Sequence, residues 1–213
     1  DDNSDNNTKQ PALYLVGLDG SGSYNYDAVA REFITIILNN AKPGSVVSIR
    51  WITSDSYTPG NSIISTTVPE IVNEKMVNPF DRAQKAQKLL GENRINEWRE
   101  ELKTKVEQAQ FPNSDHTDIL GFLTLASEKV RERTYGKVYM VILSDLKNNV
   151  SKYSQYLSEG CLDNASVVIG AYEYGDPAVK RDWSGRFERW GTDRIMFVAP
   201  EDMPEFKALI SEL

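Results

Sequence analysis

The chain has 213 residues, of which 40% are hydrophobic and 26% charged, and its formal net charge is −7. This length and composition predict one globular domain that buries about 70% of its unfolded surface, with no apolar run long enough to cross a membrane. A single cysteine and a single histidine exclude an internal disulfide framework and argue against a zinc site, while the acidic charge argues against a nucleic-acid-binding surface.

The first ten residues contain no apolar side chain and carry three aspartates against one lysine. Segments this polar are typically disordered, so we expect residues 1–11 to form a disordered leader. A spacer of this kind follows a signal peptide or a lipid-anchor cysteine, as in a bacterial lipoprotein or secreted protein. The leader therefore favours an extracytoplasmic location over a cytoplasmic one, although a solvated tail without a role fits the same composition.

From residue 12 the sequence alternates strand-like apolar runs with amphipathic helical segments. The predicted strands cover residues 12–18, 46–52, 63–68, 137–144, 165–172 and 194–198, and the predicted helices cover residues 26–38, 117–133, 178–190 and 204–213. This alternation predicts a three-layer, Rossmann-like α/β fold, with a mainly parallel central sheet and helices on both faces. The strand at 63–68 lies between proline-containing turns and is expected to be a short antiparallel strand at the sheet edge.

Residues 80–110 differ from the rest of the chain, because a narrow apolar stripe runs through a highly charged segment. The stripe keeps helical spacing at Ile95, Trp98, Leu102, Val106 and Ala109. The segment is expected to form one long helix, or two helices broken near Gly91, with a solvated charged face. We expect residues 12–213 to form a single domain in which residues 80–110 are a helical insertion.

Ligands of such folds bind beyond the carboxyl ends of the strands. The first strand ends in Asp19-Gly20-Ser21-Gly22-Ser23. Alternate residues of an extended turn point to one side, so Asp19, Ser21 and Ser23 place a carboxylate and two hydroxyls close together. Such hard oxygen donors favour Mg²⁺, Mn²⁺ or Ca²⁺ over zinc.

Two further elements would bring oxygen ligands to the same edge of the sheet. Thr117 opens a predicted helix, for which it is also the expected N-cap, and Asp145 directly follows the predicted strand at 137–144. Two carboxylates and three hydroxyls leave little excess negative charge around a divalent cation. Such a cation remains a strong Lewis acid, and a carboxylate from a partner protein is its natural additional ligand.

The Asp19–Ser23 sequence resembles the D-x-S-x-S motif of von Willebrand factor A (vWA) domains, and the resemblance extends to Thr117, Asp145 and the succession of strands and helices. In that family the motif forms a metal-ion-dependent adhesion site (MIDAS). The resemblance implies that Ser21 and Ser23 ligate Mg²⁺, or Mn²⁺ or Ca²⁺, through their hydroxyls. It further implies that Asp19 and Asp145 hold the metal directly or through water, and that Thr117 ligates directly when a partner is bound.

The sequence departs from the family pattern at three places. Leu146 follows the final aspartate, where many members have glycine or another small residue, and Tyr24 replaces a common aliphatic residue or methionine. The separation of 98 positions between Asp19 and Thr117 is longer than the family usually has. The helical segment at 80–110 accounts for the excess, and we expect it to lie beside the metal face.

The resulting functional hypothesis is a metal-dependent protein-interaction or cell-adhesion module, not an enzyme, that engages an acidic group of a partner protein. An alternative is a metal-binding accessory subunit of a catalytic or cofactor-inserting assembly, and another is a degenerate domain with a structural role. The glycines of the motif lack the spacing of a dinucleotide or phosphate loop. A hydrolase triad of Ser21, His116 and Asp145 is allowed by spacing, but the turn lacks the nucleophile-elbow pattern.

Overall fold

A computed structural model describes residues 11–21, 27–70, 81–132, 134–150, 152, 156–170, 176–199 and 202–211. Ser23, Tyr24 and nearly all of the expected leader lie outside the described residues. The described strands are β1 (Ala12–Asp19), β2 (Val46–Ile52), β3 (Ser62–Thr67), β4 (Lys137–Leu143), β5 (Ala165–Gly170) and β6 (Arg194–Val198). The described helices are α1 (Asp27–Asn40), the short 3₁₀ helix η1 (Pro59–Asn61), α2 (Arg82–Gln108), α3 (Ile119–Arg131), α4 (Pro177–Arg189) and α5 (Met203–Ser211).

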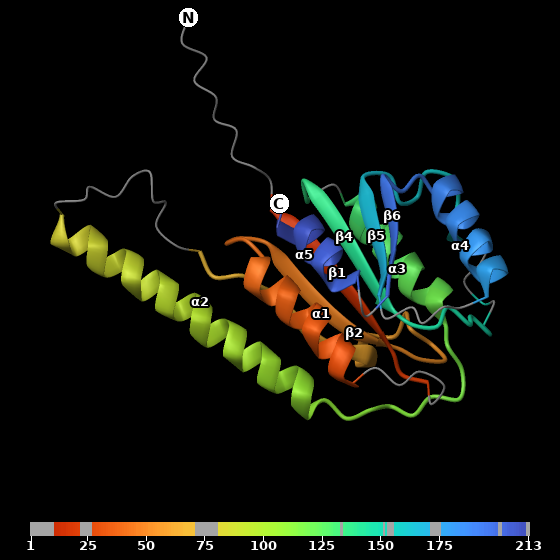
Figure 1. Ribbon diagram of the computed structural model, residues 1–213, viewed down its shortest axis with the longest axis horizontal. Helices are drawn as coiled ribbons and strands as arrows, with labels where there is room; N and C mark the ends of the chain where they lie inside the picture. Colours follow the sequence, from red (N-terminus) through yellow and green to blue (C-terminus); the bar gives the residue numbers. More distant parts are fainter. Residues whose placement is uncertain are drawn as a thin grey trace, which may run out of the picture.

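The six described strands form one sheet in the order β3-β2-β1-β4-β5-β6. Every neighbouring pair is parallel except β2 and β3, so β3 is an antiparallel edge strand. The predicted fold class and edge strand are confirmed. In the register of the sheet Asp19 pairs with Ile52, and Leu18 pairs with Leu143. The carboxyl ends of β1, β2 and β4 therefore reach the same edge of the sheet (Figure 1).

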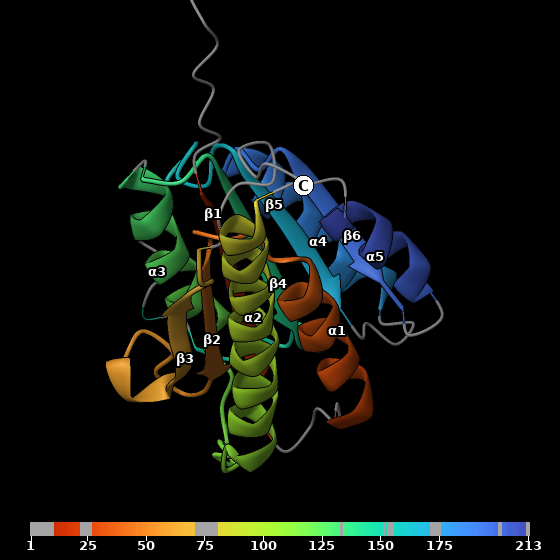
Figure 2. The same ribbon diagram turned by 90° about the vertical axis from the view of Figure 1, so that its left-hand side faces the viewer.

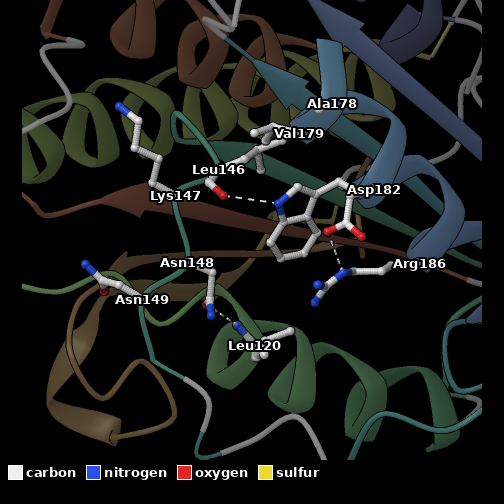
Figure 3. Close-up of a pocket in the computed structure, with 10 residues that line it drawn as sticks. Leu120, Leu146, Lys147, Asn148, Asn149, Ala178, Val179, Asp182 and Arg186 are labelled. Atoms are coloured by element: carbon white, nitrogen blue, oxygen red, sulfur yellow. Dashed lines mark hydrogen bonds and ion pairs between the residues drawn. The ribbon is translucent and has the colours of Figure 1, made fainter. Parts of the chain in front are cut away.

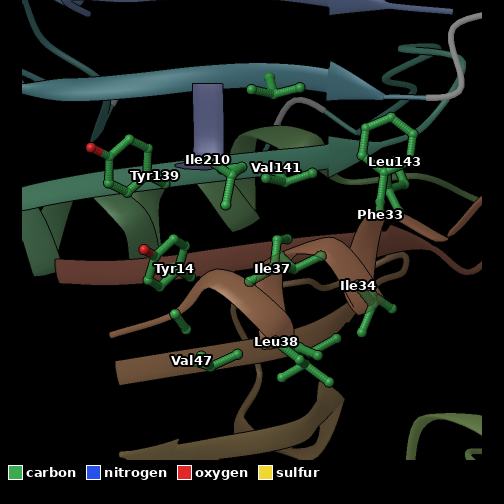
Figure 4. Packing of buried hydrophobic residues seen from close by; sticks show 14 of the residues in the cluster. Tyr14, Phe33, Ile34, Ile37, Leu38, Val47, Tyr139, Val141, Leu143 and Ile210 are labelled. Carbon is green, nitrogen blue, oxygen red and sulfur yellow. The ribbon is translucent and has the colours of Figure 1, made fainter. Parts of the chain in front are cut away.

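Helices cover both faces of the sheet, because alternate residues of each buried strand enter different cores. Tyr14 and Leu18 of β1 join the core under α1, α2 and α5, where Phe33 packs against Phe206 with ring centroids 4.6 Å apart (Figure 4). Leu15 of β1 faces the other core, formed with α3 and α4. Both faces of the central strands are thus removed from water, as their continuous apolar sequences predict.

The charged segment forms a single helix, α2, which continues through Gly91 without a break. Its buried residues, Ile95, Trp98 and Leu102, all lie in the C-terminal half. This half packs beside α1, and Arg99 donates hydrogen bonds to the carbonyls of Leu38 and Asn39 at the end of α1, at 3.0 and 2.8 Å. Figure 1 shows the N-terminal half of α2 extending past α1 and the edge of the sheet, and Figure 2 shows the helix from the side that faces away from the rest of the molecule.

The start of α3 differs from the prediction. The helix begins at Ile119, and its N-cap is Asp118, whose side chain accepts a hydrogen bond from the Gly121 amide at 2.9 Å. The prediction of Thr117 as N-cap is therefore wrong. An aspartate is an equally good cap, and it leaves the Thr117 hydroxyl available for a contact with Asp19 at the end of β1.

Candidate metal-binding site

Asp19 lies at the centre of the candidate site. It is the last residue of β1, and it is fully buried although it is charged. Its Oδ1 accepts a hydrogen bond from the backbone amide of Ser21 at 2.9 Å, which closes the turn after the strand. A buried carboxylate requires such donors, because an unpaired charge away from water is costly. The turn therefore fixes the orientation of the carboxylate.

Two buried hydroxyls from distant parts of the chain also reach this carboxylate. Thr117 Oγ1 donates to Asp19 Oδ1 at 3.3 Å, and Ser144 Oγ donates to Asp19 Oδ2 at 2.6 Å. Thr117 precedes α3, whereas Ser144 follows β4 directly. The structure therefore brings together the exits of β1 and β4 and the start of α3, as the predicted topology requires.

The hydrogen bonds leave specific acceptor positions open. A carboxylate has about four lone-pair positions, and Ser21, Thr117 and Ser144 occupy three of those on Asp19. Because the Thr117 hydroxyl donates its proton to Asp19, its lone pairs point away from the carboxylate. Counting only contacts between described residues, Asp19 thus has room for one further donor, such as a water molecule. Thr117 can offer an oxygen to a cation.

The loop after β4 positions Thr117. Asn149 Oδ1 accepts from the Thr117 amide at 2.7 Å, and the Asn149 amide donates to the Thr117 carbonyl at 3.2 Å. Asn148 Oδ1 accepts from the Ile119 amide at 2.8 Å. These contacts join Asn148 and Asn149 of the loop to the start of α3.

Asp145 is held differently from Asp19. Its Oδ1 accepts from the Lys147 amide at 3.0 Å, and its Oδ2 forms an ion pair with Lys147 Nζ at 2.9 Å. The ion pair raises the pKa of Lys147. The Lys147 side chain is 74% exposed, so the pair is weak and its ammonium group can leave readily. Among the described contacts, none joins Asp145 to Asp19, Ser21 or Thr117.

The segment between α2 and α3 crosses directly over the turn. The Gly20 amide donates to the Ile52 carbonyl at 2.8 Å, the Ser114 amide donates to the Gly20 carbonyl at 2.8 Å, and Ser21 bridges to Ser114. A side chain at Gly20 would place its Cβ 2.4 Å from Pro112 Cγ, so only glycine fits beneath this crossing. The C-terminal end of α2 thus leads into the segment that crosses the candidate site.

A second buried carboxylate lies next to the site, but its hydrogen bonds stabilise the local backbone. Asp118 is fully buried, and besides capping α3 it accepts from the Ser56 amide at 3.3 Å. Burial raises the pKa of Asp118, and the hydrogen bonds from Gly121 and Ser56 oppose this shift. Asp118 therefore stabilises the entry into α3, and its two oxygen atoms already have donors.

Sequence reasoning missed two residues that organise the site. The only indication of Ser144 in the sequence is its position, because it is a hydroxyl residue at a strand exit, beside Asp145. Asn149 carried no signal, because its contacts depend on the fold of the loop. Leu146 has a left-handed backbone with φ 62°, a conformation that glycine adopts without strain and leucine does not. The Leu146 side chain compensates by being buried.

The donor set fits a hard cation better than other chemistry. No group of three or more His, Cys, Asp or Glu residues able to hold a metal occurs in the part of the chain that the structure describes. A metal would therefore depend on hydroxyls as well as on Asp19, a combination suited to partly hydrated Mg²⁺. No contact described between these residues joins Ser21, His116 and Asp145 as a triad, because Asp145 pairs with Lys147 and His116 is exposed.

Comparisons with known proteins identify the fold. No protein-family model and no curated protein matches the sequence. Among solved structures, a von Willebrand factor type A protein from Catenulispora acidiphila matches 95% of this chain at 13% identity, with a TM-score of 0.55. The chain has a vWA-like fold. It spans 42% of that Catenulispora chain, so the likeness concerns one part of a longer protein.

Two other solved structures share the vWA-like fold of this chain. A D319A mutant of the PilB minor pilin from Streptococcus sanguinis matches 97% of this chain and 62% of its own, at 9% identity and a TM-score of 0.58. Proximal thread matrix protein 1 from the mussel byssus matches 95% of this chain and 48% of its own, at 13% identity and a TM-score of 0.51. None of the described helices of the vWA-like domain is long and apolar enough to span a membrane.

Proposed function

We propose that this vWA-like domain is a protein-interaction or adhesion module that binds a divalent cation and, through it, a carboxylate of a partner protein. The proposed ligands are Asp19, Ser21, Ser23, Thr117 and Asp145. The observation that carries the proposal is the contact between Thr117 Oγ1 and Asp19 Oδ1, at 3.3 Å, which joins two of these residues across 98 positions of sequence. A metal would supply an electrophilic position for the partner carboxylate.

The chemistry of the gathered side chains supports Mg²⁺ or Mn²⁺. The buried Asp19 carboxylate supplies the negative charge, while Thr117 contributes a neutral oxygen. In this proposal Lys147 releases Asp145 when the cation binds, which exchanges a weak exposed ion pair for metal coordination. A cation so incompletely neutralised keeps its affinity for a further carboxylate.

The proposal includes an extracytoplasmic location. It is supported by the composition of the leader, and by the occurrence of this fold in a minor pilin and in a byssal thread matrix protein. Both lines of support concern location, and the metal-binding test below does not depend on them.

The test compares thermal melts and calorimetric titrations with Mg²⁺ and Mn²⁺ for the wild type, Asp19→Asn and Asp118→Asn. The two variants are matched, because each neutralises a fully buried aspartate and only Asp19 belongs to the proposed site. A cation at a hundred times its dissociation constant stabilises the fold by about 2.7 kcal/mol. That corresponds to roughly 5–10 °C for a domain of this size. We expect this shift in the wild type and Asp118→Asn, and its loss in Asp19→Asn.

A second pair of variants tests the hydroxyl. Thr117→Val removes the proposed ligand, whereas Thr124→Val removes a buried threonine hydroxyl that bonds to the Leu120 carbonyl within α3. Cation binding should weaken only in Thr117→Val. Wild-type melts that do not respond to either metal, together with titrations that release no heat, would refute the proposed function.

A further inference from the structure

A groove runs along α4, beside the loop that follows β4. One cavity of ≈ 650 Å³ lies between the first half of α4, Leu120 of α3 and residues 146–149 (Figure 3). A second cavity of ≈ 480 Å³ continues along α4 toward Trp190. Leu120, Asp182 and Arg186 line both cavities, so the two cavities adjoin, and we call them together the α4 groove.

The cavity nearer the site has a rigid apolar floor. Leu120, Leu146 and Trp183 contribute side chains that are otherwise almost completely buried. Trp183 Nε1 donates to the Leu146 carbonyl at 3.1 Å, which fixes the indole against the loop (Figure 3). Such a preformed floor can receive an apolar side chain at little cost in conformational entropy.

The charge of the α4 groove is opposite to that of the whole molecule. Its lining contains four cations and two carboxylates, an excess of two positive charges in a chain of net charge −7. The lining cations are Lys147, Arg181, Arg186 and Arg189, and the carboxylates are Glu159 and Asp182. Such a patch attracts an acidic segment by charge complementarity.

The cations that line the α4 groove differ in whether they form ion pairs with described residues. Arg186 bonds to Asp182 at 2.9 Å and lies over the Trp183 ring, with its Cζ 5.3 Å from the ring centroid. Arg181 and Arg189 form no ion pair with any residue that the structure describes. These two arginines therefore carry the charge available to an incoming carboxylate.

The α4 groove and the candidate site share one loop. Asn149 lines the groove and also bonds to the Thr117 amide, while Lys147 lines the groove and bonds to Asp145. A bound chain that follows this loop passes from the groove to Asp19. We propose that the α4 groove binds an acidic segment of a partner protein that also carries an apolar side chain. The apolar side chain fills the cavity above Trp183.

This inference rests on the proposed function for the position of one carboxylate, which would lie at the metal. The remaining carboxylates of the segment pair with Arg181 and Arg189, and Lys147 joins them once it has released Asp145. The segment thus has a defined composition: one acid for the metal, a neighbouring apolar residue for the cavity, and further acids along α4.

The experiment uses a phage-displayed library of random peptides, selected on the full chain in the presence of Mg²⁺. A selected peptide is then labelled, and its affinity is measured by fluorescence anisotropy. Ala178→Trp fills the cavity from an exposed position of α4, and Ala86→Trp adds the same bulk to an exposed position of α2. Arg181→Glu reverses a groove charge, and Arg94→Glu reverses an exposed charge on α2.

We expect selected peptides rich in aspartate or glutamate with an apolar residue among them. Ala178→Trp and Arg181→Glu should each weaken binding by about tenfold or more, whereas the two α2 variants should bind like the wild type. Selection of basic or purely polar peptides would overturn the inference. Equal binding by all four variants would also overturn it.

Chelator and Asp19→Asn separate this inference from the proposed function. If binding needs the metal and Asp19 but ignores Ala178→Trp and Arg181→Glu, the α4 groove is excluded and the metal-dependent function stands. If binding needs the groove residues but survives chelation and Asp19→Asn, the groove is the docking surface and the metal-dependent function fails. Loss of binding in both sets supports both.

Discussion

The hydroxyl of Ser144 provides a direct test of how the Asp19 carboxylate is held. Ser144 is fully buried at the end of β4. Its Oγ donates to Asp19 Oδ2 at 2.6 Å and accepts from the Leu146 amide at 3.0 Å. Ser144→Ala removes both contacts while changing the side-chain volume little. The substitution leaves one buried carboxylate oxygen and one amide without their partner.

The expected magnitude follows from these two contacts. A hydrogen bond to a charged group contributes about 1.5–3 kcal/mol, and a neutral one about 1 kcal/mol. Ser144→Ala should therefore lower the free energy of unfolding by roughly 3 kcal/mol. For a domain of this size such a loss lowers the melting temperature by about 6–12 °C.

Urea titration without metal measures this loss, with an unchanged m-value as the sign that only stability has changed. Ser166→Ala is the control, because Ser166 is a buried strand serine whose hydroxyl has no hydrogen bond among the described contacts. A double-mutant cycle with Asp19→Asn isolates the pair. A loss below about 0.5 kcal/mol, or a coupling energy near zero, would refute the claim that Ser144 holds Asp19.

Three other substitutions test the surrounding fold. Tyr14→Phe should stabilise the protein by about 1 kcal/mol at neutral pH, because the buried hydroxyl has no hydrogen-bond partner among the described residues; a lower melting temperature would contradict this. Burial also raises the pKa of Tyr14 to about 12, so wild-type stability should fall as the pH rises from about 10 toward 12, and the variant should lack this component. Leu146→Gly relieves a left-handed backbone conformation worth about 1–2 kcal/mol but deletes a buried side chain worth about 3–4 kcal/mol. Urea titration should therefore show a net loss of about 2 kcal/mol, and equal stability would mean that strain outweighs packing. Arg99→Met removes the hydrogen bonds to the Leu38 and Asn39 carbonyls and should lower stability by about 1–2 kcal/mol in calorimetry; an unchanged melt would show that α2 does not depend on them.

Much of the fold was predictable because each element carries a periodic pattern. The runs at 12–18 and 137–144 are apolar on both faces, which requires central parallel strands, and β1 and β4 are indeed neighbours. Prolines and glycines marked the ends of β3. The continuity of α2 was left open, because Gly91 weakens a helix without breaking it, and the charged residues around it are good helix formers.

The site was only partly predictable, because its contacts join segments that have no relation in sequence. The pattern placed Asp19 and Thr117 at one edge, and the structure brings them into contact. It could not show that Ser144 is the residue at the end of β4 that reaches Asp19, since adjacent residues of a strand point to opposite faces. The pairing of Asp145 with Lys147 depends on the path of an irregular loop. Ser23 stays a prediction.

The crossing of the chain over Gly20 connects α2 mechanically to the candidate site. The helix is 27 residues long, and its N-terminal half has no buried residue, so a displacement of that half can be transmitted along the helix. The Pro112–Ser114 stretch, which follows the helix, is hydrogen-bonded to the backbone of the turn. A protein that binds the N-terminal end of α2 and tilts the helix would shift Ser21 relative to Thr117. In the proposed function, force applied far from the sheet would thereby alter the affinity of the site for its cation.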